Sequence, residues 1–241
     1  MRIYYDLHIH TALSPCGDDD MTPNNIVNMA SLCELDVIAI TDHNAAHNVA
    51  AVAAVAAKAE LVVIPGMEVE TSEEVHMICL FSKTTVCEDF CATVKSRMAE
   101  IKNRPEIFGR QLLFNAADDI LGEYGDLLLA PTDIGAYELV GLVEDIGGIC
   151  YPAHIDRASN SVISNLGIFP DDLGVGLVEF SLRADPEKFF ADNNRLFGKK
   201  YPYVQSSDAH RLVDIPERSR FLEFDRKPDA EAFIGRLRGF S

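Results

Sequence analysis

The chain has 241 residues, of which 48% are hydrophobic and 24% charged, a balance typical of a globular domain and unlike that of a disordered or membrane-embedded chain. Its formal net charge of −17 argues against non-specific nucleic-acid binding, because neutralising backbone phosphates requires a cationic surface. We therefore expect no duplex nucleic acid as a partner, and no membrane partner either, since no apolar run approaches the roughly 20 residues that span a bilayer.

The start of the chain and its cysteines bear on the compartment. The first residues enter a predicted strand directly, with no basic leader or cleavage site. Six cysteines are scattered without a Cys-X-X-Cys pair, which favours reduced thiols over a disulfide framework. We expect a cytoplasmic protein, and the sequence leaves its oligomeric state open.

Residues 1–10 are predicted to form a strand, because they are rich in apolar, β-branched and aromatic side chains. Alternation along a strand places His8 and His10 on one face, with Leu7 and Ile9 on the other. Two imidazoles on one face form a clamp for a metal ion. An exposed strand edge without a role is the alternative at this point.

A turn-rich acidic loop follows, and Thr22-Pro23 is predicted to begin a helix, with a cap followed by a proline at the first helical position. Residues 36–40 then form a buried strand that leads to Asp42 and His43. The alanine-rich residues 45–57 are predicted to be helical, with Asn44 as the cap. His43 therefore falls between the end of a strand and the start of a helix, where α/β barrels assemble their chemistry.

Residues 61–65 form a third predicted strand, which leads to Glu68 and Glu70. Two carboxylates on one face repel each other unless cations or donors lie nearby. Residues 75–81 are a further strand with His76 near its start. These two strands could also form a hairpin at the barrel edge.

The alternation of strands and helices is interrupted between residues 82 and 146. We expect a helix over 86–101, a β-hairpin over 107–124 and an amphipathic helix over 132–145. We interpret about 83–146 as an insertion carried by a single barrel domain that spans residues 1–241.

The alternation of strands and helices resumes with a strand over 148–154 that ends in His154. A strand over 176–180 follows, and residues 201–210 close the series with Asp208 and His210 as a second pair two residues apart. Six of the seven histidines thus lie on or at the ends of predicted strands, together with Glu68 and Asp208. A catalytic zinc takes about three protein ligands, so this many donors indicates two or three ions.

Five motifs resemble those of the PHP (polymerase and histidinol phosphatase) family, and they occur in that family's order along nearly the whole chain: Asp6-Leu-His-Ile-His-Thr11, Thr41-Asp-His43, Gly66-Met-Glu68, Pro152-Ala-His154 and Ser207-Asp-Ala-His210. The resemblance implies an α/β fold, a distorted, TIM-like (β/α)7 barrel, with a trinuclear metal centre. It also implies an enzyme, a phosphoesterase of the phosphatase type.

The resemblance implies three ligand sets. The first ion would be held by His8, His10, Glu68 and Asp208. Glu68 would bridge to a second ion held by His76 and His154. His43 and His210 would hold the third with a residue of the acidic loop, which offers Cys16, Asp18, Asp19 and Asp20; counting back from Thr22-Pro23 favours Asp18. The mixed imidazole and carboxylate set suits zinc, manganese or iron.

The expected chemistry follows from charge. A hydroxide that bridges two divalent ions is a nucleophile at neutral pH, because the ions lower the pKa of bound water to about 7. The substrate would be a small phosphomonoester or a nucleotide. Glu68 and Asp208 are expected to be catalytic through the ions they hold, and Arg157 and Arg211, with Arg183 as a weaker choice, to clamp the phosphate or else to form surface salt bridges. Asp42 and Glu70 are expected to orient ligands.

Two other readings remain open. An amidohydrolase-type barrel also begins with His-X-His and ends with aspartate, but commonly bridges its metals through a modified lysine, whereas here Glu68 stands at the bridging position. A non-catalytic metal-binding accessory module is the second alternative.

Overall fold

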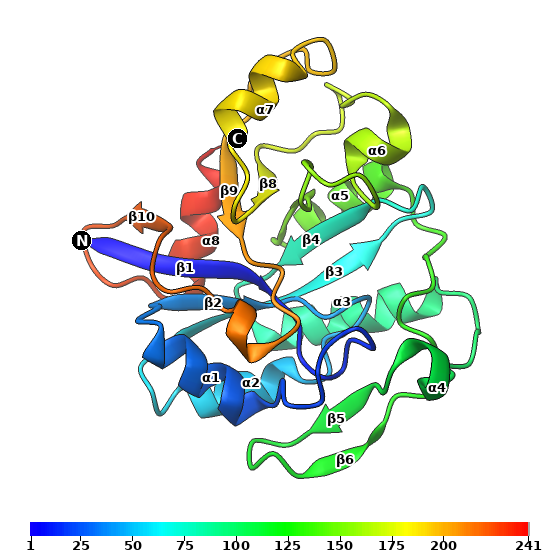
Figure 1. The fold of residues 1–241 in the computed structure, drawn as a ribbon, viewed down its shortest axis with the longest axis vertical. Helices are drawn as coiled ribbons and strands as arrows, with labels where there is room; N and C mark the ends of the chain where they lie inside the picture. Colours follow the sequence, from blue (N-terminus) through cyan, green and yellow to red (C-terminus); the bar gives the residue numbers. More distant parts are fainter. Residues whose placement is uncertain (241) are drawn as a thin grey trace.

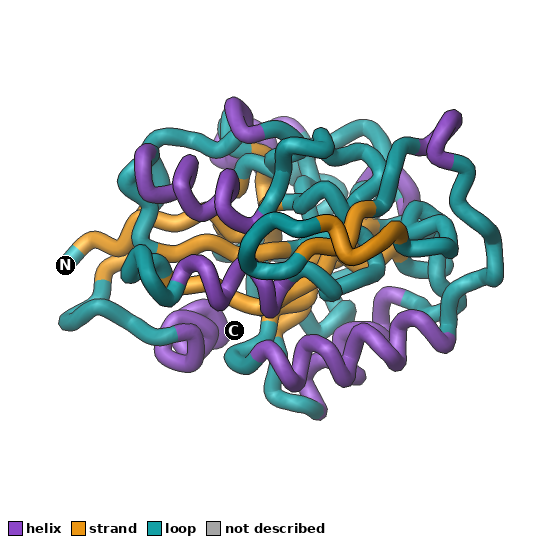
Figure 2. Tube along the Cα trace, turned by 90° about the horizontal axis from the view of Figure 1, so that it is seen from below, coloured by secondary structure: helices purple, strands orange, loops and turns teal. Residues whose placement is uncertain are grey.

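The computed structural model describes residues 1–240 as a curved wall of strands with helices packed outside it (Figure 1). The strands occupy the middle of the molecule and helices lie on both sides of them (Figure 2). The strands that build the wall are β1 (Arg2–Ile9), β2 (Val37–Ile40), β3 (Val62–Glu70), β4 (His76–Leu80), β7 (Ile149–Pro152), β8 (Val178–Ser181) and β9 (Tyr203–Ser206).

These strands follow one another around an irregular barrel. One sheet has the order β10-β1-β2-β3-β4-β7, where β10 is Phe221–Glu223, and β8 pairs with β9 in a second sheet. Backbone hydrogen bonds join the two sheets just beyond the ends of β7 and β1: the amide of Ile155 donates to Glu179 O at 2.9 Å, and the amide of His10 donates to Ala209 O at 3.0 Å. The predicted distorted seven-stranded barrel is therefore confirmed.

One strand of the wall runs against its neighbours. β1, β2 and β3 are parallel, whereas β4 is antiparallel to both β3 and β7. The β3–β4 pair is thus a hairpin, but β4 lies inside the wall and not at its edge. The start of β4 therefore meets the carboxyl ends of β3 and β7.

Two apolar clusters fill the two sides of the wall. The inner cluster includes Leu7, Ile64 and Tyr151 and is continuous with Phe233 of α8 (Ala230–Arg238), which closes the amino-terminal end of the barrel. The outer cluster packs the wall against helices α1 (Pro23–Leu32), α2 (Val49–Ala56), α3 (Thr84–Ser96) and α5 (Ala136–Asp145). Fully burying one large apolar side chain stabilises the fold by about 1.5–3 kcal/mol.

A register shift between Asp6 and Ile9 interrupts the pairing of β1 with β2. Leu7 belongs to the inner cluster and Ile9 to the outer one, so the expectation that they share a face is wrong. An irregularity of this kind re-aims the side chains that follow it.

The helix predicted over 45–57 is shorter in the structure, and its expected cap has another role. α2 begins at Val49, and Asn44 adopts a left-handed backbone with φ 48°. The Asn44 side chain donates to Leu128 O at 2.9 Å and accepts from the Glu70 amide at 3.0 Å. It therefore ties β3 to the segment between β4 and β7. The predicted Thr22 cap of α1 is present and accepts from the Asn25 amide.

The chain leaves the wall after β4 and returns at β7, which pairs directly with β4. The expected hairpin is β5 (Leu112–Phe114) with β6 (Ile120–Glu123), preceded by the short α4 (Pro105–Phe108). The helices expected at 86–101 and 132–145 are α3 and α5. The remaining elements are α6 (Val162–Leu166), α7 (Pro186–Asp192) and a 3₁₀ turn, η1 (Leu212–Asp214). Among residues 1–240, no helix is both long and apolar enough to cross a membrane.

Candidate metal centre

The carboxyl ends of the parallel strands bring the predicted donors to one end of the barrel. His8 and His10 come from β1, His43 follows β2, and Glu68 lies near the end of β3. His154 follows β7, and Asp208 and His210 follow β9. His76 stands at the start of β4, and the reversed direction of β4 places it at the same end.

Glu68 is the centre of this cluster. Its Oε1 lies 2.8 Å from His76 Nδ1, 3.1 Å from His154 Nε2 and 3.5 Å from His8 Nε2. Its Oε2 lies 3.0 Å from His43 Nδ1 and 3.4 Å from His10 Nε2. One carboxylate buried to 1% exposure thus contacts five imidazoles, the arrangement expected of a carboxylate shared between ions.

Donor atoms within 4.8 Å of one another form three groups: His8, His10, Glu68 and Asp208; His43, Glu68 and His76; and His10, His43 and His210. The first group has the same members as the set implied by the resemblance. The second contains His43 where His154 was expected, although His154 also contacts Glu68. The third adds His10 to the expected His43 and His210.

Besides the grouping of the donor atoms, their unsatisfied polar atoms also fit bound divalent cations. Three buried polar atoms at this site make no hydrogen bond of good geometry: His154 Nδ1, His43 Nδ1, which lies 3.0 Å from Glu68 Oε2, and Asp208 Oδ1, which lies 3.0 Å from His10 Nε2. Leaving such an atom unsatisfied costs about 1–3 kcal/mol. The Nε2 atoms of His8 and His10 lie 3.1 Å apart, which places two nitrogens that favour metal binding side by side.

The electrostatics of the centre are those of closely packed opposite charges. Burial alone raises the pKa of Glu68, but the facing imidazoles of His76, His8 and His43 hold it well below its usual range. Burial lowers the pKa of His8, yet the carboxylates of Asp208, Glu179 and Glu68 raise it well above its usual value. The pKa of His10 is well below its usual value because of burial and the neighbouring His210 and His43.

Glu179 on β8 is a positioning residue that sequence reasoning missed. Its Oε1 lies 2.8 Å from His8 Nδ1 and accepts from the His154 amide at 3.3 Å. A carboxylate on the second nitrogen of a metal-binding histidine fixes the ring's tautomer and orientation. The available signal was a lone glutamate in the apolar strand 176–180, because a buried carboxylate requires a partner.

Ser14 is a second residue of this kind. Its hydroxyl donates to Asp42 Oδ1 at 2.7 Å, lies 2.9 Å from His10 Nδ1 and accepts from the His43 amide at 3.1 Å. Asp42 therefore contacts His10 indirectly, through the Ser14 hydroxyl, and this is how it can orient that ring. Glu70 is more distant from its ligand, with Oε2 4.0 Å from His76 Nε2.

Asp6 holds the chain next to Asp208. Its Oδ1 accepts from the Ser207 amide at 3.0 Å and its Oδ2 from the Ser207 hydroxyl at 2.5 Å. Burial raises the pKa of Asp6 to about 6, against the lowering effect of these hydrogen bonds. Asp208 itself has a left-handed φ of 54°, and His154 a φ of 28°. Such backbone is costly for residues other than glycine and recurs at functional sites.

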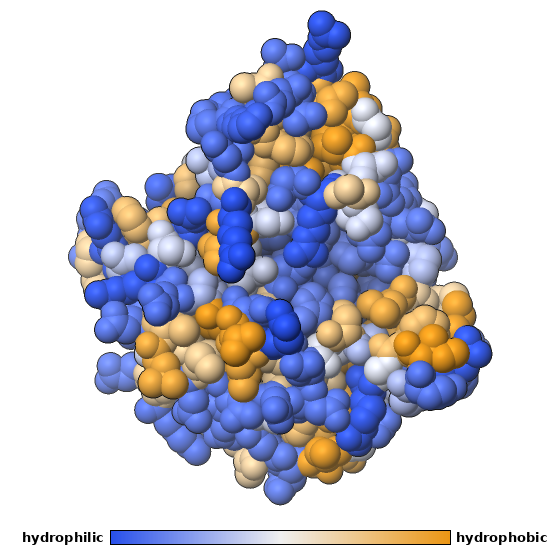
Figure 3. Space-filling model, in the orientation of Figure 1, coloured by the Kyte–Doolittle hydropathy of each residue, from blue (hydrophilic) through white to orange (hydrophobic). Residues whose placement is uncertain are grey.

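The three arginines singled out in the sequence line one recess beside Asp208, with a volume of about 860 Å³. Nη1 of Arg157 lies 2.5 Å from Asp208 Oδ2. Arg211 forms an ion pair with Asp214 at 2.9 Å, and Arg183 is exposed. The centre of the face in Figure 3 is hollowed and mostly hydrophilic.

The structure does not bring the Asp18 carboxylate into the donor groups. Asp18 is exposed, and the groups of donor atoms within residues 1–240 do not include it. Its amide donates to His210 O at 2.9 Å, so the backbone of Asp18 contacts the site while its side chain faces solvent.

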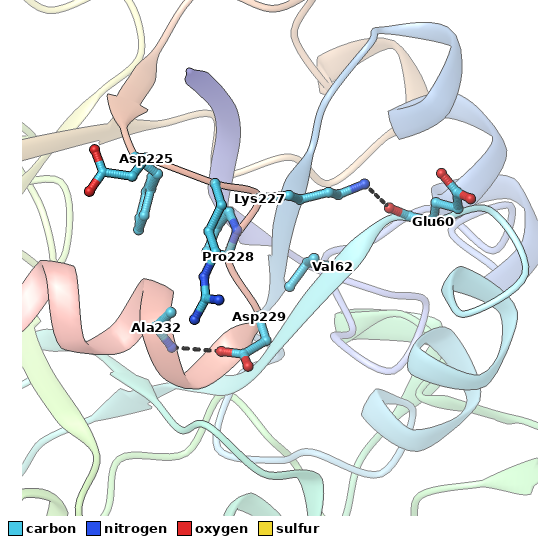
Figure 4. A pocket seen from close by; sticks show the side chains of 9 residues that line it. Glu60, Val62, Asp225, Lys227, Pro228, Asp229 and Ala232 are labelled. Atoms are coloured by element: carbon cyan, nitrogen blue, oxygen red, sulfur yellow. Dashed lines mark hydrogen bonds between the residues drawn. The ribbon is translucent and has the colours of Figure 1, made fainter.

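A second recess of about 810 Å³ lies at the opposite end of the barrel, between the start of β3 and α8 (Figure 4). Its polar groups serve the fold: Lys227 donates to Glu60 O at 2.6 Å, and Asp229 caps α8 by accepting from the Ala232 amide at 2.8 Å. This recess holds none of the clustered metal donors.

Comparison with known proteins adds to this geometry. The family model of the PHP domain matches residues 6–178, and no curated protein matches the chain. A candidate metal-dependent phosphoesterase from Bifidobacterium adolescentis has a TM-score of 0.62 and 17% identity, over 92% of this chain and 93% of that one. An amidohydrolase from Chromobacterium violaceum, solved with bound sulfate and no metal, has a TM-score of 0.58 and 18% identity over 98% and 96%.

Endonuclease Q is also similar in fold. The lesion-specific enzyme from Pyrococcus furiosus has a TM-score of 0.59 and 18% identity, over 88% of this chain and 49% of that one. This chain thus spans about half the length of endonuclease Q. Another endonuclease Q structure, equally similar with a TM-score of 0.59, contains a 27-mer duplex with an abasic lesion at its active site.

That complex overturns one expectation from composition. Duplex nucleic acid can occupy the active site of a protein with this fold, so excluding it as a partner was wrong. Net charge sums over the whole surface, whereas binding depends on the local field, and bound cations reverse that field locally. Since the PHP family model covers well over half of the chain, and the barrel and its donors agree with that match, the chain belongs to the PHP domain family.

Proposed function

We propose that this chain is a metal-dependent phosphoesterase that holds two or three divalent ions, zinc, manganese or iron, and hydrolyses a phosphate ester. The observation that carries this proposal is Glu68, one buried carboxylate in contact with five imidazoles, beside a recess lined by three arginines. Ions bound there would activate water for attack and neutralise the phosphate oxygens.

The protein's own residues have positioning roles in this proposal. Glu68 and Asp208 carry the negative charge that holds the ions together, and the six imidazoles complete their coordination. Glu179 and Ser14 fix the rings of His8 and His10 from behind. Because these supports belong to strands and to a hydrogen-bonded loop, the site is held with little slack.

Arg157 is the arginine best placed to hold the substrate. It is 43% exposed and lies at the mouth of the recess, against Asp208 Oδ2. An ion bound by Asp208 competes for that carboxylate, which leaves the guanidinium available for a phosphate. Bidentate pairing is the preferred mode of arginine with phosphate. Arg211 is already paired with Asp214.

The substrate class in this proposal is a phosphate group at the end of a small molecule, a nucleotide or a nucleic acid. The test is a panel of phosphomonoesters and phosphodiesters, including duplex DNA with and without an abasic site, assayed before and after chelation. We expect hydrolysis that chelation abolishes, and that His10→Ala and Asp208→Asn abolish while the fold is retained. His47→Ala, outside the donor groups, is the matched control.

A second candidate function is amide hydrolysis, which the fold of the Chromobacterium violaceum amidohydrolase brings into consideration. Turnover of amides without turnover of phosphate esters would favour it. Bound metal with no turnover of any ester or amide would instead favour a metal-binding accessory module.

A further inference from the structure

The imidazoles around Glu68 differ in the ring nitrogen that they direct inward. His8 and His154 approach Glu68 Oε1 with Nε2, whereas His76 approaches it with Nδ1, at 2.8 Å. A nitrogen that binds a metal ion uses its lone pair, so the proton of a neutral imidazole then lies on the other nitrogen and needs an acceptor. For His76 that outer nitrogen is Nε2.

Asn160 contacts His76 at two points. Its side-chain Nδ2 lies 3.0 Å from His76 Nε2, and its backbone carbonyl accepts from the His76 amide at 2.9 Å. His76 is 8% exposed, so little water competes for these bonds. One residue therefore holds both the ring of His76 and the start of β4.

Glu70 is the other polar side chain near this nitrogen. Its Oε2 lies 4.0 Å from His76 Nε2, which is beyond hydrogen-bond distance. The orienting role that the sequence suggested for Glu70 is thus better filled, at His76, by Asn160.

The backbone around Asn160 keeps it in this place. Asn160 has a left-handed φ of 54°, which asparagine adopts more readily than most residues. The next residue, Ser161, caps α6 by accepting from the Ser164 amide at 3.1 Å and donates to Arg157 O at 2.8 Å. The Arg157 amide in turn donates to His154 O at 2.9 Å. The loop that carries Asn160 is therefore fixed between His154 and α6.

The amide of Asn160 can pair with His76 Nε2 whether or not that nitrogen carries a proton. In the structure Nδ2 faces Nε2 and can donate to it. A half-turn of the amide presents Oδ1, which accepts from a protonated Nε2. A carboxylate at this position could only accept, and an aliphatic side chain could do neither.

We propose that Asn160 is a positioning residue that directs Nδ1 of His76 towards an ion shared with Glu68. The inference rests on the proposed metal centre. Neutral His76 gives up its Nδ1 proton to solvent when the ion binds and takes up one proton at Nε2, which donates to the Asn160 oxygen. A hydrogen-bond acceptor behind a metal-binding histidine fixes the orientation of the ring and strengthens its bond to the ion.

Two variants separate this role from a structural one, because glycine and aspartate both tolerate a left-handed backbone. Asn160→Gly removes the partner of Nε2, so the zinc affinity of one site, measured by competition with a chromophoric chelator, should fall by about 10- to 100-fold. Asn160→Asp keeps an acceptor and should bind zinc at least as tightly as the unaltered protein. The control is Glu34→Gly, which has the same φ of 54° in the turn before β2 and should leave zinc affinity unchanged.

Nitrogen NMR of protein labelled in its histidine rings gives a second readout that does not depend on enzymatic activity. With zinc bound, the ring signals that are absent in His76→Ala should show zinc on Nδ1 and the proton on Nε2. Zinc on Nε2 of His76 would overturn the assignment.

The affinities decide in the same way. Equal zinc affinity of Asn160→Gly and the unaltered protein, or an equal loss in Asn160→Gly and Asn160→Asp, would also overturn the assignment. Weaker zinc binding by Asn160→Gly alone, in a protein that hydrolyses no ester, would support the positioning role and refute the proposed function.

Discussion

Oε1 of Glu179 lies 2.8 Å from Nδ1 of His8, and the exposed fraction of each side chain is 1% or less. We expect Glu179→Ala to weaken metal binding by about 10- to 100-fold, as loss of a carboxylate behind a metal-binding histidine does. Glu179→Gln should lose less, because its amide oxygen still accepts from the ring. Competition with a chromophoric chelator measures this, with Glu231→Ala on α8 as the control. Equal affinity in all three variants would refute the positioning role.

Arg157 and Arg211 should behave differently although both line the recess. Arg157→Ala removes a charge-assisted contact worth about 1.5–3 kcal/mol, so kcat/KM for a hydrolysed phosphate ester should fall by about 10- to 100-fold. Arg211→Ala should change it less than about threefold, because the 60% exposed Arg211 already pairs with Asp214 and exposed pairs contribute little. Steady-state kinetics of both variants on one ester measures this difference. A larger loss of kcat/KM in Arg211→Ala than in Arg157→Ala would show that Arg211 is the arginine that holds the phosphate.

Removing metal should destabilise the fold. Without ions, the buried atoms His43 Nδ1, His154 Nδ1 and Asp208 Oδ1 make no hydrogen bond of good geometry. An ion present at 100 times its dissociation constant stabilises the native state by about 2.7 kcal/mol. Thermal unfolding should therefore shift upward with added zinc and return after chelation. The unfolding temperature of His47→Ala should rise with zinc as much as that of the unaltered protein, and that of His10→Ala should rise less. An equal rise in the two variants would show that the metal binds outside this cluster.

Gly109 should tolerate no side chain, because it supports the loop that carries Cys16. It has φ +100°, and a Cβ there would lie 1.9 Å from the carbonyl oxygen of Pro15. Gly109→Ala is expected to destabilise the protein by more than about 1 kcal/mol, the usual size of a left-handed backbone penalty. The control is Gly141→Ala on α5, where nothing lies within 4 Å of the added Cβ and a gain of about 0.4–1 kcal/mol is expected.

Denaturant unfolding of both glycine variants, followed by metal titration, checks this prediction. Gly109→Ala should also bind less metal at the third group, since the loop over His10 and His43 moves with Pro15. Equal free energies of unfolding for the two variants would show that the loop around Pro15 can move to accept the added Cβ without loss of stability.

Much of the barrel could be predicted because its determinants are local. Apolar runs ending in His43, Glu68 and His154 are visible in a linear reading, and the carboxyl ends of parallel strands meet at one edge. The direction of β4 is less obvious, because a short apolar strand has the same pattern whether it runs parallel or antiparallel. The role of Asn44 depends on its hydrogen bonds with the carbonyls of residues 128 and 130, which no local pattern contains.

The sequence by itself determined the seven-stranded wall and the histidine, glutamate and aspartate side chains that line its mouth, since strand periodicity and chain order place them there. Only the tertiary structure decided three features of the site. Glu179 supports His8, the Ser14 hydroxyl connects Asp42 with His10 by hydrogen bonds, and Asp18 faces solvent. The physical reason is that a hydrogen bond such as that between His8 and Glu179 joins residues far apart in the chain, and its geometry exists only once the barrel closes.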